Sequence, residues 1–310
     1  MISYRAATPA DLDRVTAWTV REPVAWIAAD RYLDELAEGM YRQEWTWLAE
    51  DGDRLVGRAL WWGPKSSAHP IALDCLDVDP AAGDRAAVAT GLMSAALAGF
   101  AAPVQYAVKV AAGWREDPAT VAAVEWRRAA ARAAGLTREV ERLQFEWTPA
   151  AGVPSAATGA LRFAAAPDEE FLAVFQRIAE GSLDAETRAN LAELGAEATA
   201  REEMDFYLGA PGKREWWRLA YTPEGLVAGM AIPSATPYSV NVGYLGVVPE
   251  FRGRGYVDEV LAEITRFHAI GGARRITATT DLGNAPMAAA FLRAGYRVTE
   301  IRLNFSNAGV

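Results

Sequence analysis

The most informative part of the sequence is Val242-Gly243-Tyr244-Leu245-Gly246-Val247-Val248, an apolar run that ends at Pro249. Glu250-Phe251-Arg252-Gly253-Arg254-Gly255-Tyr256 follows it directly. Apolar side chains then recur at helical spacing, at Val257, Val260, Leu261, Ile264 and Phe267. The sequence therefore predicts a strand, a glycine loop and a helix, in this order.

The glycine loop suits an anionic ligand. Gly253 and Gly255 let the backbone turn sharply and let a ligand approach without a Cβ in the way. The first amides of the following helix lack intrahelical partners and carry the positive end of the helix dipole, which favours a phosphate. Arg252 and Arg254 add positive charge. The dinucleotide fingerprint is excluded, because Asp258 stands where its third glycine belongs.

The arrangement around this loop resembles the GNAT superfamily of acetyl-CoA-dependent N-acetyltransferases. The match runs over residues 245–255, continues through a helix and a strand at 275–280, and includes Asp281-x-x-Asn284-x-x-Met287. Ala294-Gly295-Tyr296 then opens the last strand of the pattern. These features cover roughly residues 240–300. The resemblance implies an α/β fold with a mixed sheet and an acyltransferase activity.

The resemblance also implies how acetyl-CoA is held. In the superfamily, two central parallel strands part beside the glycine loop, and the pantetheine arm lies in the gap. Backbone groups of Leu245 and Val247 would meet the acetyl and pantetheine part, and the amides of 252–257 would hold the pyrophosphate. Asn284 would contact the pantetheine or would only cap the following helix. The residues assigned to acetyl-CoA are Leu245, Gly246, Val247, Val248, Arg252, Gly253, Arg254, Gly255, Tyr256, Val257 and Asn284.

The residues that commonly carry the chemistry of the superfamily differ here. Many members have a tyrosine seven residues after the asparagine, which protonates the thiolate, but this chain has Phe291. Many also have a glutamate as the base on the strand before the loop, where this chain has Asn241. Tyr244 is a substitute acid, although strand alternation puts it on the opposite face from Asn241. Asn241 and Tyr244 are thus the catalytic candidates, without a clear base.

The base is left open by the sequence. A water relayed from an acidic side chain can deprotonate the amine, and Asp281 and Glu224 are the candidates for that side chain. Proximity of amine and thioester also accelerates transfer without any base. Arg127 and Arg128 are predicted to lie on the solvated face of a helix.

Composition narrows the class of protein. The 310 residues are 51% hydrophobic and 23% charged, which suits a soluble protein of about two domains. The net charge of −9 disfavours nucleic-acid binding, and it serves either solubility or the attraction of a cationic substrate such as an amine. Two histidines and one cysteine are too few for a His/Cys metal site, so no metal is expected. Without an 18-residue apolar run or a signal-peptide core, we expect a cytoplasmic protein that does not bind membranes, and the alanine-rich, arginine-over-lysine composition suggests a bacterium.

A repeat of domain size runs through the chain. Pro80 and Pro249 end similar apolar strands 169 residues apart (249 − 80), and an Asp51-Gly52 hairpin signal has a counterpart in the second half. We predict two GNAT-like domains in tandem, 1–148 and 159–310, each a mostly antiparallel mixed sheet flanked by helices. The Pro/Gly/Ala/Ser-rich stretch at about 149–158 would link them. Ala81-Ala82-Gly83-Asp84-Arg85 replaces the glycine loop in the first copy, where Asp84 would repel a phosphate, so that acetyl-CoA site is predicted to be degenerate.

These observations predict an N-acetyltransferase that moves an acetyl group from acetyl-CoA to a primary amine of a small molecule. Two alternatives stay open. In the first, the protein is an acyl-CoA-using enzyme that transfers a longer acyl group or cleaves the thioester. In the second, it is a non-catalytic acyl-CoA-binding or regulatory protein. The sequence does not identify the acceptor, and it allows a monomer whose halves form a pseudo-dimer as well as a homodimer.

Overall fold

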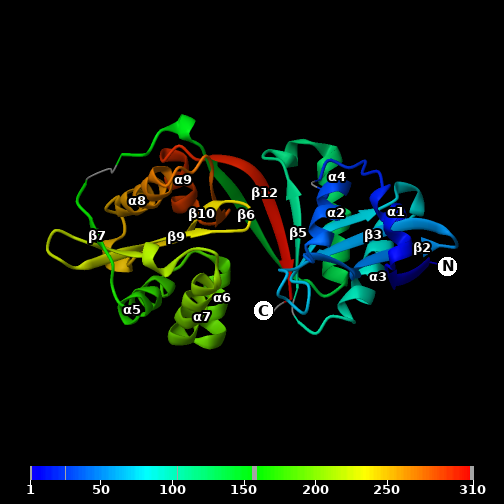
Figure 1. Cartoon of the computed structure of the whole chain (residues 1–310), viewed down its shortest axis with the longest axis horizontal. Helices are drawn as coiled ribbons and strands as arrows, with labels where there is room; N and C mark the ends of the chain where they lie inside the picture. Colours follow the sequence, from blue (N-terminus) through cyan, green and yellow to red (C-terminus); the bar gives the residue numbers. More distant parts are fainter. Residues whose placement is uncertain (1, 25, 103, 156–158, 308–310) are drawn as a thin grey trace. The chain divides into compact units, whose positions relative to one another are not determined.

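The computed structural model describes residues 2–24, 26–102, 104–155 and 159–307 (Figure 1). The chain divides into two compact units. Unit 1 comprises Met1–Glu141 with Glu300–Val310, and unit 2 comprises Arg142–Thr299. Within the predicted linker, Pro149–Ala151 form a 3₁₀ turn, and residues 156–158 lie outside the described part. No helix in the described ranges has the length and apolar character that a membrane span requires.

Unit 1 is a mixed sheet with the strand order β1-β2-β3-β4-β5-β12, and among its described strand pairs only β4 and β5 are parallel. Helices α1 and α2 pack on a core that contains Leu48, Leu60 and Cys75. The strands are β1 (Ile2–Ala6), β2 (Tyr41–Asp51), β3 (Arg54–Trp62), β4 (Ala72–Val78), β5 (Gln105–Val110) and the later part of β12 (Arg297–Ser306). The helices are α1 (Leu12–Thr16), α2 (Ala29–Ala37), α3 (Arg85–Leu97) and α4 (Pro118–Ala133).

Unit 2 has the strand order β7-β8-β9-β10-β11-β6, and β10 with β11 is the one parallel pair in the part of this unit that the structure describes. In Figure 1, α8 and α9 cover one face of this sheet, and α5, α6 and α7 lie together on the other. The strands are β6 (Arg138–Trp147), β7 (Arg162–Ala164), β8 (Arg218–Tyr221), β9 (Val227–Ala235), β10 (Val240–Val247) and β11 (Ile276–Asp281). The helices are α5 (Asp168–Ala179), α6 (Ala185–Leu194), α7 (Ala196–Gly209), α8 (Tyr256–Ile270) and α9 (Ala285–Arg293).

The two units repeat one succession of elements. Each has a hairpin (β2–β3 or β8–β9) whose turn contains a glycine with positive φ, Gly52 at 60° and Gly225 at 84°. A strand, a helix and a parallel strand follow, and the parallel strands are joined by only two residue pairs in each unit. The predicted repeat of mostly antiparallel mixed sheets is therefore confirmed.

Two strands make the observed division differ from the predicted 1–148 and 159–310. Residues 142–147 of β6 pair with β11 in unit 2, although they precede the predicted linker. Residues 301–305 of β12 pair with β5 in unit 1, although they end the chain. Each half of the sequence thus supplies a strand to the other half's sheet. Strands pair through backbone hydrogen bonds, which do not depend on which side chains are present. The alternating pattern of these strands therefore does not reveal which sheet they join.

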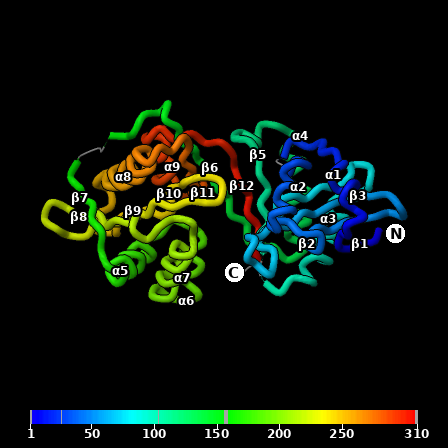
Figure 2. The backbone as a smooth tube through the Cα atoms, viewed as in Figure 1, coloured from blue at the N-terminus to red at the C-terminus, as the bar shows by residue number. Residues whose placement is uncertain are grey.

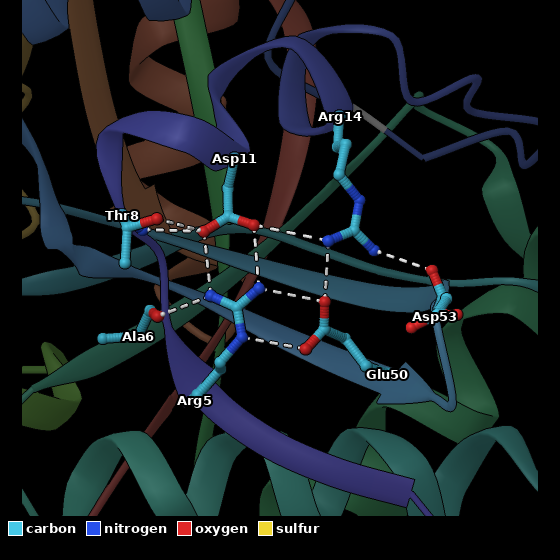
Figure 3. Close-up of polar contacts among 7 residues, drawn as sticks. All are labelled: Arg5, Ala6, Thr8, Asp11, Arg14, Glu50 and Asp53. Carbon is cyan, nitrogen blue, oxygen red and sulfur yellow. Dashed lines mark hydrogen bonds and ion pairs between the residues drawn. The ribbon is translucent and has the colours of Figure 1, made fainter.

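A network of charged side chains connects β1, the first helical turns and the end of β2 in unit 1 (Figure 3). Arg5 donates to both oxygens of Asp11 at 2.8 Å and, through Nε, to Glu50 at 2.8 Å. The backbone N–H and the hydroxyl of Thr8 also donate to Asp11 at 2.8 Å. These hydrogen bonds, that of Arg5 first, hold the pKa of Asp11 well below its usual range.

Acid should therefore destabilise unit 1 through Asp11. A carboxyl whose pKa is lowered by folding stabilises the protein fully above its unfolded pKa of about 3.9, and this contribution is lost as the pH falls through the lower folded value. We expect Asp11→Asn to cost roughly 1.5–3 kcal/mol at pH 7, as is usual for hydrogen bonds to a charged group. Urea unfolding at a series of pH values checks this, and the difference between wild type and variant should shrink below about pH 4. An equal difference at every pH would contradict the assignment.

Candidate functional site

The glycine loop has the conformation that its sequence predicts. Gly253 and Gly255 have φ values of 76° and 77°, in the left-handed region where a residue with a Cβ is strained. A Cβ built on either glycine meets no atom within 4 Å, so the backbone turn and not crowding requires glycine. Gly255 is the N-cap of α8, and no side chain in the described part of the chain caps this helix start. The Asp258 amide donates to the Gly255 carbonyl at 3.1 Å, whereas the amides of Tyr256 and Val257 at the start of α8 are available to an external anion.

The strands beside the loop pair only where they begin. The parallel register joins Val240 to Ile276 and Asn241 to Thr277, whereas β10 continues to Val247 and β11 to Asp281. Figure 2 shows β10 and β11 as neighbours in unit 2. On its other edge, β10 stays paired with β9 as far as Val247. The stretch 245–247 therefore lies where no described strand pairs with β10 on the β11 side, as the resemblance implied for the pantetheine arm. Val248, just beyond it, is fully buried in the core under α5.

The side chain of Arg252 binds backbone carbonyls and does not point its charge at the start of α8. Its Nε donates to the carbonyl of Val247 at 3.0 Å, and its Nη1 and Nη2 donate to Gly181 O at 2.7 Å and Ile178 O at 3.3 Å. Arg252 therefore ties the C-terminal end of α5, where the helix dipole favours a cation, to the end of β10. The prediction that Arg252 places its charge beside a phosphate is wrong. The guanidinium of Arg254 lies 5.1 Å from the centre of the Phe251 ring.

Asn284 and Phe291 both have structural roles in α9. Asn284 is the N-cap of this helix, and its side chain accepts a hydrogen bond from the Met287 amide at 3.4 Å. Of the two roles left open for Asn284, the helix cap is the one observed. Phe291 is 2% exposed and stacks on Phe145 with the ring centres 4.8 Å apart. An apolar core thus occupies the position where many superfamily members place their acid.

A β-bulge corrects the predicted placement of Tyr244. Asn241 pairs with Ser234 and Tyr244 with Ile232, so three steps along β10 match two along β9. Paired residues point to one face, and Ser234 and Ile232 are two apart on β9, so Asn241 and Tyr244 share a face. The predicted opposite facing of Asn241 and Tyr244 is wrong because β10 is bulged and not a regular strand.

Neither catalytic candidate is suited to take a proton from an amine. The amide of Asn241 cannot act as a base, and its oxygen accepts a hydrogen bond from the backbone N–H of Gly243 at 3.3 Å. Tyr244 packs against the rings of Phe175 and Tyr207, with centres 4.9 and 5.8 Å away. Burial raises the pKa of Tyr244 well above its ordinary value, so its phenol retains the proton and cannot serve as the base. The role of Tyr244 as a substitute acid stays a prediction. A base must come from elsewhere.

The two acidic candidates from the sequence have other partners. Asp281 accepts hydrogen bonds from Arg142 Nε at 2.8 Å and from the Ala185 amide at 2.6 Å, so it is paired with a cation and holds the start of α6. Glu224 lies exposed in the β8–β9 turn. The pKa of Glu224 is lowered, chiefly by a hydrogen bond that its carboxylate accepts from the Thr222 side chain, so Glu224 is ionised near neutral pH. Asp281 therefore has a structural role at the start of α6, and Glu224 is not placed in the environment of a base.

A different carboxyl, Glu203, has the environment of a base. It lies on α7, half-buried, and its Oε1 accepts from the Thr187 hydroxyl at 3.4 Å. Burial, together with the nearby Asp184 and Glu186, raises the pKa of Glu203 to about 7. Sequence reasoning missed this residue because α5, α6 and α7 carry no motif. The only available signal was that Glu203 and Tyr207, four residues apart, share a helix face.

In unit 1, side chains occupy both the helix start and the strand carbonyl that correspond to the free helix start and the unpaired strand edge of unit 2. The carboxylate of Asp84 caps α3 and accepts from the Ala87 amide at 3.0 Å, so an acidic side chain occupies that helix start. The side chain of Arg127 donates to Leu76 O on β4 through Nη2 at 3.0 Å and Nε at 3.3 Å. Leu76 matches Leu245 at the repeat distance of 169 residues (245 − 76). Arg127 is only 2% exposed, so its prediction as a solvated side chain is wrong.

Comparisons with known proteins confirm the fold. No family model matches the sequence, and no curated protein matches it. A GCN5-related N-acetyltransferase from Sphaerobacter thermophilus has a TM-score of 0.54 at 17% identity, covering 99% of this chain and 95% of that chain. The GCN5-related glucosamine N-acetyltransferase region of a fungal multi-domain GH3 β-N-acetylglucosaminidase has a TM-score of 0.55 at 16% identity, covering 98% of this chain and 38% of that longer chain. The predicted tandem GNAT-like fold is therefore confirmed, and at these identities the likeness concerns the fold alone.

Proposed function

We propose that unit 2 transfers an acetyl group from acetyl-CoA to a primary amine of a small molecule. The observation that carries the proposal is the parting of β10 and β11 beside the uncapped start of α8. An extended thioester arm can line the unpaired stretch of β10, while a pyrophosphate at the helix start meets the first amides and the positive end of the dipole. The shared fold with GCN5-related N-acetyltransferases supports the same reaction class.

The residues of the loop fit a pyrophosphate through their backbone. The left-handed Gly253 and Gly255 turn the chain so that no Cβ stands between the loop amides and a ligand. Unlike Arg252, whose guanidinium is bound to α5, Arg254 lies exposed over Phe251. Acetyl-CoA supplies the reactive thioester, and the chain holds it in place next to the acceptor.

One working site per chain follows from the difference between the units. In unit 1, Asp84 caps the equivalent helix, and Arg127 fills the hydrogen-bonding capacity of Leu76 O. A phosphate at α3 would have to displace a carboxylate and would be repelled by it. Unit 1 is proposed to support unit 2 without binding acetyl-CoA. A cytoplasmic location and a single chain acting as a pseudo-dimer remain parts of this proposal.

A second candidate is a non-catalytic acyl-CoA-binding or regulatory protein. Asn241 and Phe291, at the usual places of base and acid, favour it. The same two residues favour an enzyme of different chemistry, which transfers a longer acyl group or cleaves the thioester.

An assay with acetyl-CoA and a panel of small primary amines separates these functions. The free thiol of CoA is followed with a thiol reagent, and mass spectrometry identifies the acetylated amine. We expect thiol release only when a suitable amine is present, with a mass gain of one acetyl group on that amine. Thiol release without any amine would instead show thioester cleavage. Saturable acetyl-CoA binding without release would identify a binding protein.

A further inference from the structure

Glu203 lies beside the part of β10 where the strands separate. Tyr207, one helical turn after Glu203 on α7, donates its hydroxyl to the carbonyl of Gly243 at 3.0 Å. Gly243 belongs to the bulge of β10, and the rings of Tyr207 and Tyr244 are 5.8 Å apart. The Tyr207 contact therefore fixes the Glu203 face of α7 against the strand that would border a bound thioester.

The surroundings of Glu203 are acidic. Asp184 and Glu186 face it from the start of α6, and Tyr207 and Tyr244 adjoin it from α7 and β10. The nearby cation, Arg142 of β6, is shared by Asp184 at 2.9 Å and Asp281 of β11 at 2.8 Å. From α5, Arg177 pairs with Glu250. No salt bridge reaches Glu203 among the residues that the structure describes.

We propose that Glu203 accepts the proton of the acceptor's ammonium group, and that Glu203 with Asp184 and Glu186 selects a cationic amine. This inference rests on the function proposed above for unit 2. The geometry supplies what Asn241 lacks, a carboxyl on the face that Asn241 and Tyr244 share, attached to β10 through Tyr207. The carboxylates of Glu203, Asp184 and Glu186 attract a cation and disfavour an anionic acceptor.

The ammonium gives one proton to Glu203, which leaves a neutral amine. The amine nitrogen forms a bond to the acyl carbon, and the carbon–sulfur bond of the thioester breaks with its electron pair on sulfur. The nitrogen loses a second proton, which ends on the sulfur of CoA. Glu203 then releases its proton to water, so the amide, CoA and one proton leave the site.

The protonation behaviour of Glu203 is consistent with this role. Burial and the carboxylates Asp184 and Glu186 raise its pKa to about 7, against about 4.3 for an ordinary glutamate. A base with a pKa near the working pH is still ionised in a large fraction of molecules and is strong enough to take up a proton. Below pH 7 Glu203 is increasingly protonated, so the rate should fall on the acid side.

The test compares Glu203→Gln with Glu202→Gln, using the best amine of the panel. Glu202 neighbours Glu203 but is exposed, with only a 3.4 Å contact from Asn190, and serves as the matched control. We expect Glu203→Gln to lower kcat about 100-fold or more, to raise KM for the amine and to leave KM for acetyl-CoA unchanged. The acid limb of the kcat/KM profile near pH 7 should disappear in Glu203→Gln and persist in Glu202→Gln. Glu203→Asp should recover part of the rate.

A second measurement does not depend on turnover. Carboxyl ¹³C NMR of the wild-type protein should show one glutamate that titrates near pH 7 and whose signal is absent from Glu203→Gln. A glutamate titration only near pH 4, or an unchanged kcat and pH profile in Glu203→Gln, would overturn the role of Glu203 while leaving acetyl transfer intact. A wild type that binds acetyl-CoA but acetylates no amine would overturn the proposed function and this inference with it.

Discussion

Gly253→Glu is expected to weaken acetyl-CoA binding by at least 100-fold, which corresponds to roughly 2.7 kcal/mol. Two effects act in the same direction. A residue with a Cβ at a φ of 76° costs about 1–2 kcal/mol of backbone strain, which distorts the loop. The added carboxylate also stands next to the helix start that the pyrophosphate would use, and like charges repel. Isothermal calorimetry of wild type and variant measures the effect.

Gly83→Glu is the matched control for this prediction. Gly83 precedes α3 in unit 1 with a φ of 81°, and a Cβ built on it also meets no atom within 4 Å. Glutamate there also places a side chain at a positive φ and adds the same charge, but in the unit that we propose does not bind acetyl-CoA. Its affinity should equal that of the wild type. An equal loss in both variants would mean that the binding site is not at the loop of unit 2.

Arg127→Met is expected to destabilise unit 1 by about 3–5 kcal/mol, as is usual when one partner of a buried ion pair is removed. Arg127 is 2% exposed, and besides Leu76 O its Nη1 donates to Glu22 at 2.7 Å and to Ala123 O at 2.9 Å. Methionine keeps most of the volume but leaves these acceptors without their donor. Denaturant unfolding followed by circular dichroism measures the loss.

Arg132→Met is the control on the same helix. Arg132 bonds to Glu139 at 3.0 Å, but its side chain is 56% exposed, so its ion pair should contribute less than about 1 kcal/mol. A loss in Arg127→Met no larger than that in Arg132→Met would contradict the structural role of Arg127. Acetyl-CoA binding to unit 1 in Arg127→Met, absent from the wild type, would show directly that this side chain closes the site.

The strand, loop and helix around Gly253 could be predicted because local sequence determines them. Two glycines in the left-handed region, a helix that starts beside them and an apolar periodicity are features of one continuous stretch. The repeat was also readable, since hairpin glycines and apolar strands recur in order. Local sequence patterns gave less information about which distant groups the side chains contact in the folded chain.

The failures have identifiable physical causes. The bulge in β10 reversed the facing of Tyr244, because one extra residue shifts the alternation that follows it. Arg252 turned toward the end of α5, and Arg127 toward Leu76, because each found unpaired carbonyls in segments distant in sequence. Nothing in the sequence between Arg252 and Gly181, 71 positions away, or Ile178, 74 positions away, signals such a contact. Glu203 became a candidate only when packing placed it beside Asp184 and Glu186.

Titration of the wild-type protein with acetyl-CoA in a calorimeter tests the central claim most directly. The claim is that unit 2 holds acetyl-CoA between parted strands and at the start of α8, and that unit 1 is closed. We predict saturable binding with a stoichiometry near one per chain. A stoichiometry near two would show that Asp84 and Arg127 do not close unit 1. The absence of binding to a folded protein would contradict acetyl transfer altogether.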